Sequence, residues 1–159
     1  MSATIRFATP DDAKTVHEMI VALAVYEKEP DAVEATPDSL ATQLGEQPGP
    51  FECLLLENDG VAKGIALFFH NYSTWRGKRG LYLEDLFVLP DARGKGYGLA
   101  LLRRLAQLAV ERDCARMEWA VLDWNEPAMK FYEKLGAKAI GEWVIHRITD
   151  DELRALAIG

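Results

Sequence analysis

Apolar residues alternate with polar ones in some stretches of the chain and recur every three or four positions in others, so both strands and helices are predicted. The strand pattern covers residues 4–8, 51–57, 61–72, 81–89, 116–122 and 138–148. The helical pattern covers residues 9–26, 36–45, 98–112 and 125–135, and a short helix follows residue 149. This mixture predicts one α+β domain, residues 1–159, built around a mixed sheet.

Residues that favour turns and helix starts lie between these segments. Thr9 and Pro10, and again Thr36 and Pro37, place a capping hydroxyl before a proline in the first helical turn. The Asn-Asp-Gly run at 58–60 predicts a tight turn that joins two antiparallel strands. The local signals therefore agree with the hydrophobic pattern.

Composition and charge limit the function classes. Of the 159 residues, 49% are hydrophobic and 27% charged, which is ordinary for one globular domain. The net charge of −7 disfavours DNA, RNA and anionic membranes as partners. The N-terminus lacks a secretory-signal pattern, and the apolar runs are far shorter than the roughly 20 residues of a membrane helix. We therefore expect a cytoplasmic protein with no nucleic-acid or membrane partner.

The cysteines and histidines give no sign of metal or covalent chemistry. Cys53 and Cys114 lie in apolar stretches, which predicts two reduced core thiols and a reducing compartment. His17, His70 and His146 have no metal-ligand spacing with one another or with the cysteines, so no metal site is expected.

The most informative motif is the glycine-rich run RGKGYG at 93–98, between a predicted buried strand and a long helix. Glycines allow positive φ and close backbone approach, and the free amides at a helix start attract anions. The loop therefore predicts a phosphate or pyrophosphate site, with a purely structural turn as the alternative. A P-loop would need Ser or Thr after Lys95, where Gly96 stands, and the third glycine of a dinucleotide site is replaced by Leu99 or Leu101.

The pattern Arg-x-x-Gly-x-Gly in this loop resembles the GNAT (Gcn5-related) N-acetyltransferases. The strings YLEDLFV at 82–88, WNEP at 124–127 and FYEKLGA at 131–137 resemble the diamine (spermidine/spermine) acetyltransferase subgroup. The resemblance implies a GNAT-like fold, with a mostly antiparallel central sheet flanked by helices. It also implies acetyl-CoA as cosubstrate, acetyl transfer to a primary amine, and a homodimer.

The same resemblance assigns the cofactor-binding residues. The backbone of the fourth strand would bind the pantetheine arm, the glycine-rich loop the pyrophosphate, and the start of the helix at 125–135 the rest of the arm. These residues are Leu86, Phe87 and Val88; Arg93, Gly94, Lys95, Gly96, Tyr97, Gly98 and Leu99; and Asn125, Glu126, Pro127, Ala128 and Tyr132.

Two residues are candidates for proton transfer. An amine with a reference pKa near ~10.4 must lose a proton before it attacks a thioester. Glu84, inside an apolar strand, is the candidate base, directly or through water; the alternative is a buried carboxylate paired with Arg or Lys. Asp85 should point to the opposite face and serve a structural or supporting role. Tyr132 resembles the family's general acid, with a core aromatic as the alternative.

The acceptor is less specified. Tyr26, Glu27, Glu84 and Glu118 match positions that the subgroup uses near its substrate. The acidic residue that polyamine enzymes carry just before the loop tryptophan is absent here, and three cations follow that tryptophan: Arg76, Lys78 and Arg79. The acceptor is therefore a polyamine, a diamine or a lysine analogue, attacked directly in a ternary complex. Two other functions stay open: a protein or peptide acetyltransferase, and a catalytically silent acyl-CoA sensor.

Overall fold

The computed structural model describes residues 3–159. They form two compact units, the first ending at Ala120 and the second comprising Val121–Gly159. In the part of the chain that the structure describes, no helix is both long enough and apolar enough to cross a bilayer.

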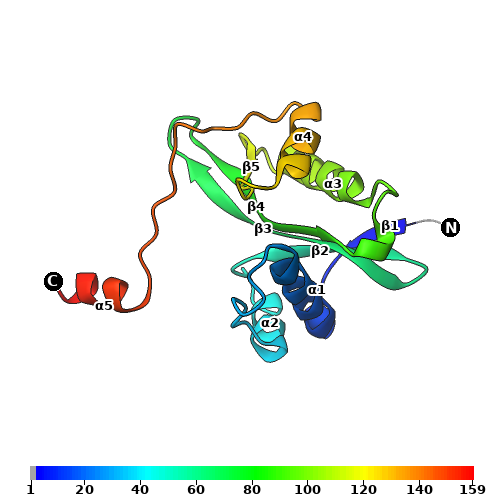
Figure 1. Ribbon diagram of the computed structural model, residues 1–159, viewed down its shortest axis with the longest axis horizontal. Coiled ribbons are helices and arrows are strands. Elements are labelled where there is room, and N and C mark those ends of the chain that lie inside the picture. The colour runs from blue at the N-terminus through cyan, green and yellow to red at the C-terminus, as the bar shows by residue number, and fades with distance from the viewer. Residues whose placement is uncertain (1–2) are drawn as a thin grey trace. The chain divides into compact units, whose positions relative to one another are not determined.

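The first unit is built on a five-stranded sheet with the strand order β1-β2-β3-β4-β5 (Figure 1). Its strands are β1 (Ala3–Phe7), β2 (Glu52–Asn58), β3 (Val61–Ser73), β4 (Lys78–Val88) and β5 (Met117–Trp119). The first four are antiparallel neighbours, and β5 runs parallel to β4. The predicted α+β class with a mixed, mostly antiparallel sheet is confirmed.

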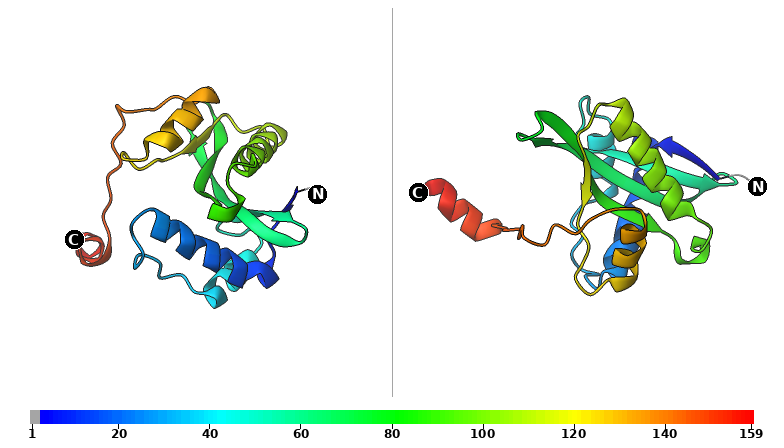
Figure 2. Two further views of the ribbon diagram at one scale, coloured as in Figure 1. Left: turned by 45° about the vertical axis from the view of Figure 1, so that its right-hand side comes forward. Right: turned by 90° about the horizontal axis from the view of Figure 1, so that it is seen from above.

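Helices cover both faces of this sheet (Figures 1 and 2). One face carries the short 3-10 helix η1 (Pro10–Asp12), α1 (Ala13–Tyr26) and α2 (Pro37–Leu44). The other carries α3 (Tyr97–Glu111), which the short helix η2 (Pro90–Ala92) precedes. The core therefore has two parts, one on each face of the sheet. Val16, Met19 and Leu23 pack with Cys53, Leu55, Ile65, Leu67 and Phe87 on the α1 side, and the buried face of α3 is Leu101, Leu102, Leu105 and Leu108.

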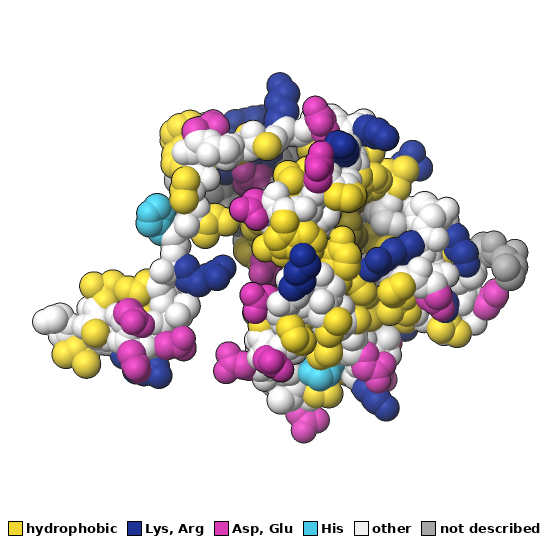
Figure 3. Space-filling view, viewed as in Figure 1, with side chains coloured by type: hydrophobic (Ala, Val, Ile, Leu, Met, Phe, Trp, Pro, Cys, Tyr) yellow, Lys and Arg dark blue, Asp and Glu magenta, His cyan; other side chains and the backbone are white. Residues whose placement is uncertain are grey.

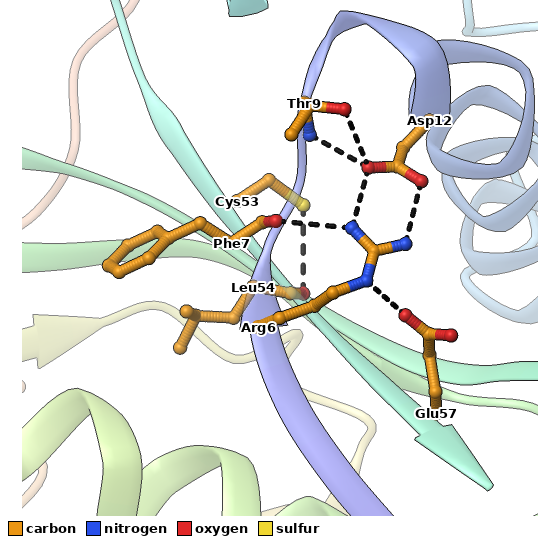
Figure 4. A network of polar contacts seen from close by, with 7 residues as sticks. All are labelled: Arg6, Phe7, Thr9, Asp12, Cys53, Leu54 and Glu57. Carbon is orange, nitrogen blue, oxygen red and sulfur yellow. Dashed lines mark hydrogen bonds and ion pairs between the residues drawn. The ribbon is translucent and has the colours of Figure 1, made fainter. Parts of the chain in front are cut away.

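Arg6 connects the edge strand β1 to Asp12 of η1 and Glu57 of β2 (Figure 4). Its two terminal nitrogens each donate to a carboxylate oxygen of Asp12 at 2.8 Å, and its Nε donates to Glu57 on β2. The backbone amide of Thr9 donates to the same Asp12 carboxylate at 2.7 Å. These donors, Arg6 above all, lower the pKa of Asp12 to about 2. The charged network therefore joins β1, the 3-10 helix η1 and β2.

The two cysteines are free, but they differ in environment. Cys53 is buried on the α1 side of the sheet, and burial raises the pKa of its thiol to about 12. Cys114 is only half-buried, in the turn after α3. Only Cys53 is therefore a core thiol; the expectation of two was wrong for Cys114.

The second unit contains α4 (Glu126–Lys134) and α5 (Asp150–Ile158), both predicted. The predicted strand at 138–148 is wrong, because residues 138–149 form no strand (Figure 2). A strand is stable only when a neighbour satisfies its backbone amides and carbonyls, and within these residues the alternation finds no ladder. Apolar side chains are left exposed here and on α5 (Figure 3): Ile140, Trp143, Val144, Ile145, Ile148, Leu153, Leu156 and Ile158.

Candidate active site

A β-bulge in β4 places the two predicted acidic residues. Leu83 lies opposite Phe68 and Asp85 opposite Leu67, so Glu84 is an extra residue with no partner on β3. The insertion moves every following side chain of β4 to the other face of the sheet. Asp85 thereby joins Leu67 and Phe87 on the α1 side. The expectation that Asp85 points away from Glu84's side of the sheet was wrong, because a regular strand had been assumed.

The bulge gathers carboxylates at the end of α1. Burial, then the charges of Glu84 and Glu27, raises the pKa of Asp85 to about 6. Burial and the charge of Glu84 also raise the pKa of Glu27, the C-cap of α1. Glu84 itself is exposed, and within residues 3–120 no Arg or Lys forms an ion pair with it. Glu27, Glu84 and Asp85, here called the carboxylate cluster, therefore lie close enough for the charge of each to act on the others.

The carboxylate cluster lacks the arrangement of ligands that a metal site needs. Among residues 3–159, no three His, Cys, Asp or Glu side chains are arranged so that they could hold a metal ion. What the cluster offers is negative charge and groups able to accept a proton. Both properties suit a cationic amine.

Glu118 is held differently from the carboxylate cluster. It lies on β5 opposite Tyr82, whose pKa is raised by burial and by the charges of Glu84 and Glu118. Its Oε1 accepts a hydrogen bond from Asn71 at 3.3 Å and pairs with the Nε of Arg116 at 3.1 Å. The charge of Glu118 is thus partly compensated. Sequence reasoning missed Asn71 and Arg116, and no motif marks them.

The glycine-rich loop has the backbone that an anion site requires. Gly94 and Gly96 have φ of 80° and 79°, in the left-handed region that side chains rarely adopt. Gly96 is the N-cap of α3, and its carbonyl accepts the amide of Ala100 at 3.0 Å. The amides of Tyr97, Gly98 and Leu99 therefore stand in the first turn, where no carbonyl of the helix precedes them. The loop is exposed, and this fits a pyrophosphate group.

After the bulge, β4 extends beyond its ladder with β5. Leu86, Phe87 and Val88 pair with Ala66, Ile65 and Gly64 of β3. The ladder with β5 covers only Leu81–Leu83 of β4. Residues 84–88 therefore lie beyond the ladder with β5, and the Val88 carbonyl accepts a hydrogen bond from the Nε of Arg93 at 3.0 Å. Backbone groups of such a strand edge can hydrogen-bond an extended amide chain such as pantetheine.

The remaining predicted site residues belong to the second unit. Asn125 is the N-cap of α4, and its side chain accepts the backbone amide of Ala128 at 3.4 Å. Pro127 lies in the first turn of that helix, and Glu126 pairs with Lys130 at 3.1 Å. Tyr132 is half-buried, with its ring centroid 5.5 Å from that of Phe131. Asn125 therefore caps α4.

Comparison with known proteins gives consistent matches. The profile of the Acetyltransferase (GNAT) family matches residues 14–137. The chain is 36% identical over 165 positions to the thialysine N-epsilon-acetyltransferase of Bos taurus, covering 96% of both proteins. It is 33% identical over 201 positions to the L-ornithine N5-acetyltransferase of Arabidopsis thaliana, covering 98% of this chain and 88% of that protein. An integron cassette protein from the mobile metagenome of V. cholerae matches with a TM-score of 0.83 at 28% identity, covering 100% of this chain and 99% of that one.

Proposed function

We propose, since the chain belongs to the GNAT acetyltransferase family and is an acyltransferase that uses acetyl-CoA, that its acceptor is a small primary amine. The observation that carries this proposal is the carboxylate cluster of Glu27, Glu84 and Asp85. Buried or mutually repelling carboxylates gain most from a cation that compensates them, and an alkylammonium group is such a cation. The acceptor is then a polyamine, a diamine or a lysine analogue.

Within those classes, a short amino-acid-like amine fits best. Glu118, which matches a position that the subgroup uses near its substrate, is already partly compensated by Arg116. Arg76 and Arg79 add positive charge around the β3–β4 turn, which disfavours a second ammonium group and favours a carboxylate on the acceptor. Relatives named for thialysine and ornithine, both amino acids with a terminal amine, support the same choice.

The proposed reaction is direct attack in a ternary complex. Glu84, directly or through a water molecule, accepts a proton from the acceptor's ammonium group, and the freed nitrogen attacks the thioester carbonyl carbon. The new C–N bond forms as the C–S bond breaks, and Tyr132 donates a proton to the departing thiolate. The nitrogen loses its second proton to solvent as the amide forms, and Tyr132 regains a proton from solvent. The first-turn amides of α3 and the edge of β4 beyond the β5 ladder would bind acetyl-CoA, together with Asn125 and the start of α4.

A homodimer and a cytoplasmic location complete the proposal, with residues 1–159 acting as one domain. Support for a dimer comes from the second unit, where Trp143 is 69% and Ile158 87% exposed. Such a series of apolar side chains is more typical of an interface than of a monomer's surface. Light scattering coupled to size exclusion tests this; a monomer at micromolar concentration would overturn the dimer without affecting the acceptor assignment.

An acceptor screen tests the proposed function. Purified protein with acetyl-CoA is offered thialysine, ornithine, putrescine, spermidine and lysine-containing peptides, and release of the CoA thiol is followed. We expect the highest kcat/KM for an amino acid with a terminal amine. A preference for peptides would overturn the small-amine assignment, and tight acetyl-CoA binding with no turnover on any amine would indicate the silent sensor.

A further inference from the structure

Arg93 occupies a position that its motif does not predict. The sequence pattern assigns it to the pyrophosphate site with the rest of the loop. Its Nε instead donates to the carbonyl of Val88 at 3.0 Å. Its guanidinium carbon lies 5.1 Å from the ring centroid of Tyr26 and 5.5 Å from that of Phe87. The side chain therefore turns back toward the end of α1.

These contacts connect three segments that are distant in sequence. Val88 and Phe87 end β4, Tyr26 ends α1, and Arg93 itself begins the glycine-rich loop. A guanidinium suits this role because its flat faces stack on aromatic rings while its edge donates a directed hydrogen bond. A lysine at the same position would lose the planar stacking and the fixed donor geometry.

The contact with Tyr26 reaches the acceptor side of the proposed site. Tyr26 precedes Glu27, the C-cap of α1 and a member of the carboxylate cluster. Fixing the Tyr26 ring therefore fixes the backbone that carries Glu27. Lys95 and the first-turn amides of α3 remain in the exposed loop to contact an anion.

We propose that Arg93 is a positioning residue for the acceptor site, holding Tyr26, and through it Glu27, against the end of β4. This inference rests on the proposed function, since it assigns Arg93 to amine binding. It separates the first arginine of the motif from the glycines that follow it. Loss of Arg93 should then weaken the amine site more than the acetyl-CoA site.

A double-mutant cycle tests the contact. Arg93→Met keeps the aliphatic stem but removes the charge and the donor, while Tyr26→Leu removes the ring and Tyr26→Phe keeps it. We expect Arg93→Met to raise the amine KM by about fivefold, the order of the Arg93–Tyr26 cation–π contact alone. The dissociation constant of acetyl-CoA, measured by calorimetry, should change less than twofold.

The effect of Arg93→Met is compared between the two Tyr26 variants. The effect of Arg93→Met should persist in Tyr26→Phe and largely disappear in Tyr26→Leu. An equal effect in both backgrounds, or a rise in the acetyl-CoA dissociation constant with an unchanged amine KM, would overturn the proposal and return Arg93 to the phosphate site. The same cycle read by thermal unfolding needs no acceptor. Coupling there, with no amine turnover, would refute the proposed function while preserving the Arg93–Tyr26 contact.

Discussion

Removing the charge of Asp85 should change how stability depends on pH. Asp85 lies on the α1 side of β4, and burial, Glu84 and Glu27 raise the pKa of its carboxyl from 3.8 to about 6. The folded protein therefore binds this proton more tightly than the unfolded chain does. The stability that the proton contributes is present below about pH 4 and is lost as the pH rises through about 6.

The size of the effect follows from that difference. Roughly two pKa units correspond to about 3 kcal/mol, which the charged carboxylate costs the native state above pH 7. Asp85→Asn keeps the shape of the side chain and removes the titration. Its free energy of unfolding, relative to wild type, should rise by about 3 kcal/mol between pH 4 and pH 7 and stay level above that.

Urea unfolding at half-unit pH steps measures this difference. Asp59→Asn is the matched control, because Asp59 is exposed in the β2–β3 turn, with a φ of 52° that asparagine also tolerates. A flat difference between Asp85→Asn and wild type from pH 4 to pH 7 would refute the reasoning. It would show that Asp85 is hydrated or that the bulge does not turn it toward α1.

Three further predictions concern the chemistry. Gly96→Val cannot keep a φ of 79° without strain, so the acetyl-CoA KM should rise by about tenfold or more; an unchanged KM in a folded variant would remove Gly96 from the cofactor site. Glu84→Gln should lower kcat by on the order of 10²–10⁴, with partial recovery at alkaline pH as the amine loses its own proton; a pH profile identical to wild type would exclude Glu84 as the base. Tyr132→Phe should lower kcat without abolishing it, since a thiolate departs fairly well unaided, and should change acetyl-CoA affinity little. Activity within about twofold of wild type would reduce Tyr132 to a packing residue.

The sequence predicted the strands and helices of the first unit because their periodicity and caps are local signals. It did not predict the face on which Asp85 lies, since a bulge is a property of two paired strands. A signal was nevertheless present: Glu84 and Asp85 are adjacent polar residues in an apolar strand. Leu83 and Phe87 would share a face in a regular strand, yet only Phe87 belongs to the α1 core.

Two other structural features could not be predicted from local sequence patterns. The alternation at 138–148 is that of a strand, but alternation does not supply a partner, and no ladder forms there. The motif likewise specified an arginine at position 93 without specifying what its side chain would contact. Tyr26, some 67 positions earlier in the chain, lies beside it only because α1 ends near the end of β4.

The placement of β1 has a consequence for the order in which the molecule assembles. β2, β3 and β4 are joined in sequence by two hairpins. β1 instead pairs with β2 although α1 and α2 separate the two strands in sequence, as the partners Phe7 and Leu54 show. Closing that long loop costs entropy that only the finished contacts, including the Arg6 network, repay. The central meander can therefore form first and β1 dock last. For the same reason, the β1 amides should be the first of the sheet to exchange with solvent. Raised salt screens the Arg6 ion pairs, so it should weaken the pairing of β1 before that of the central strands.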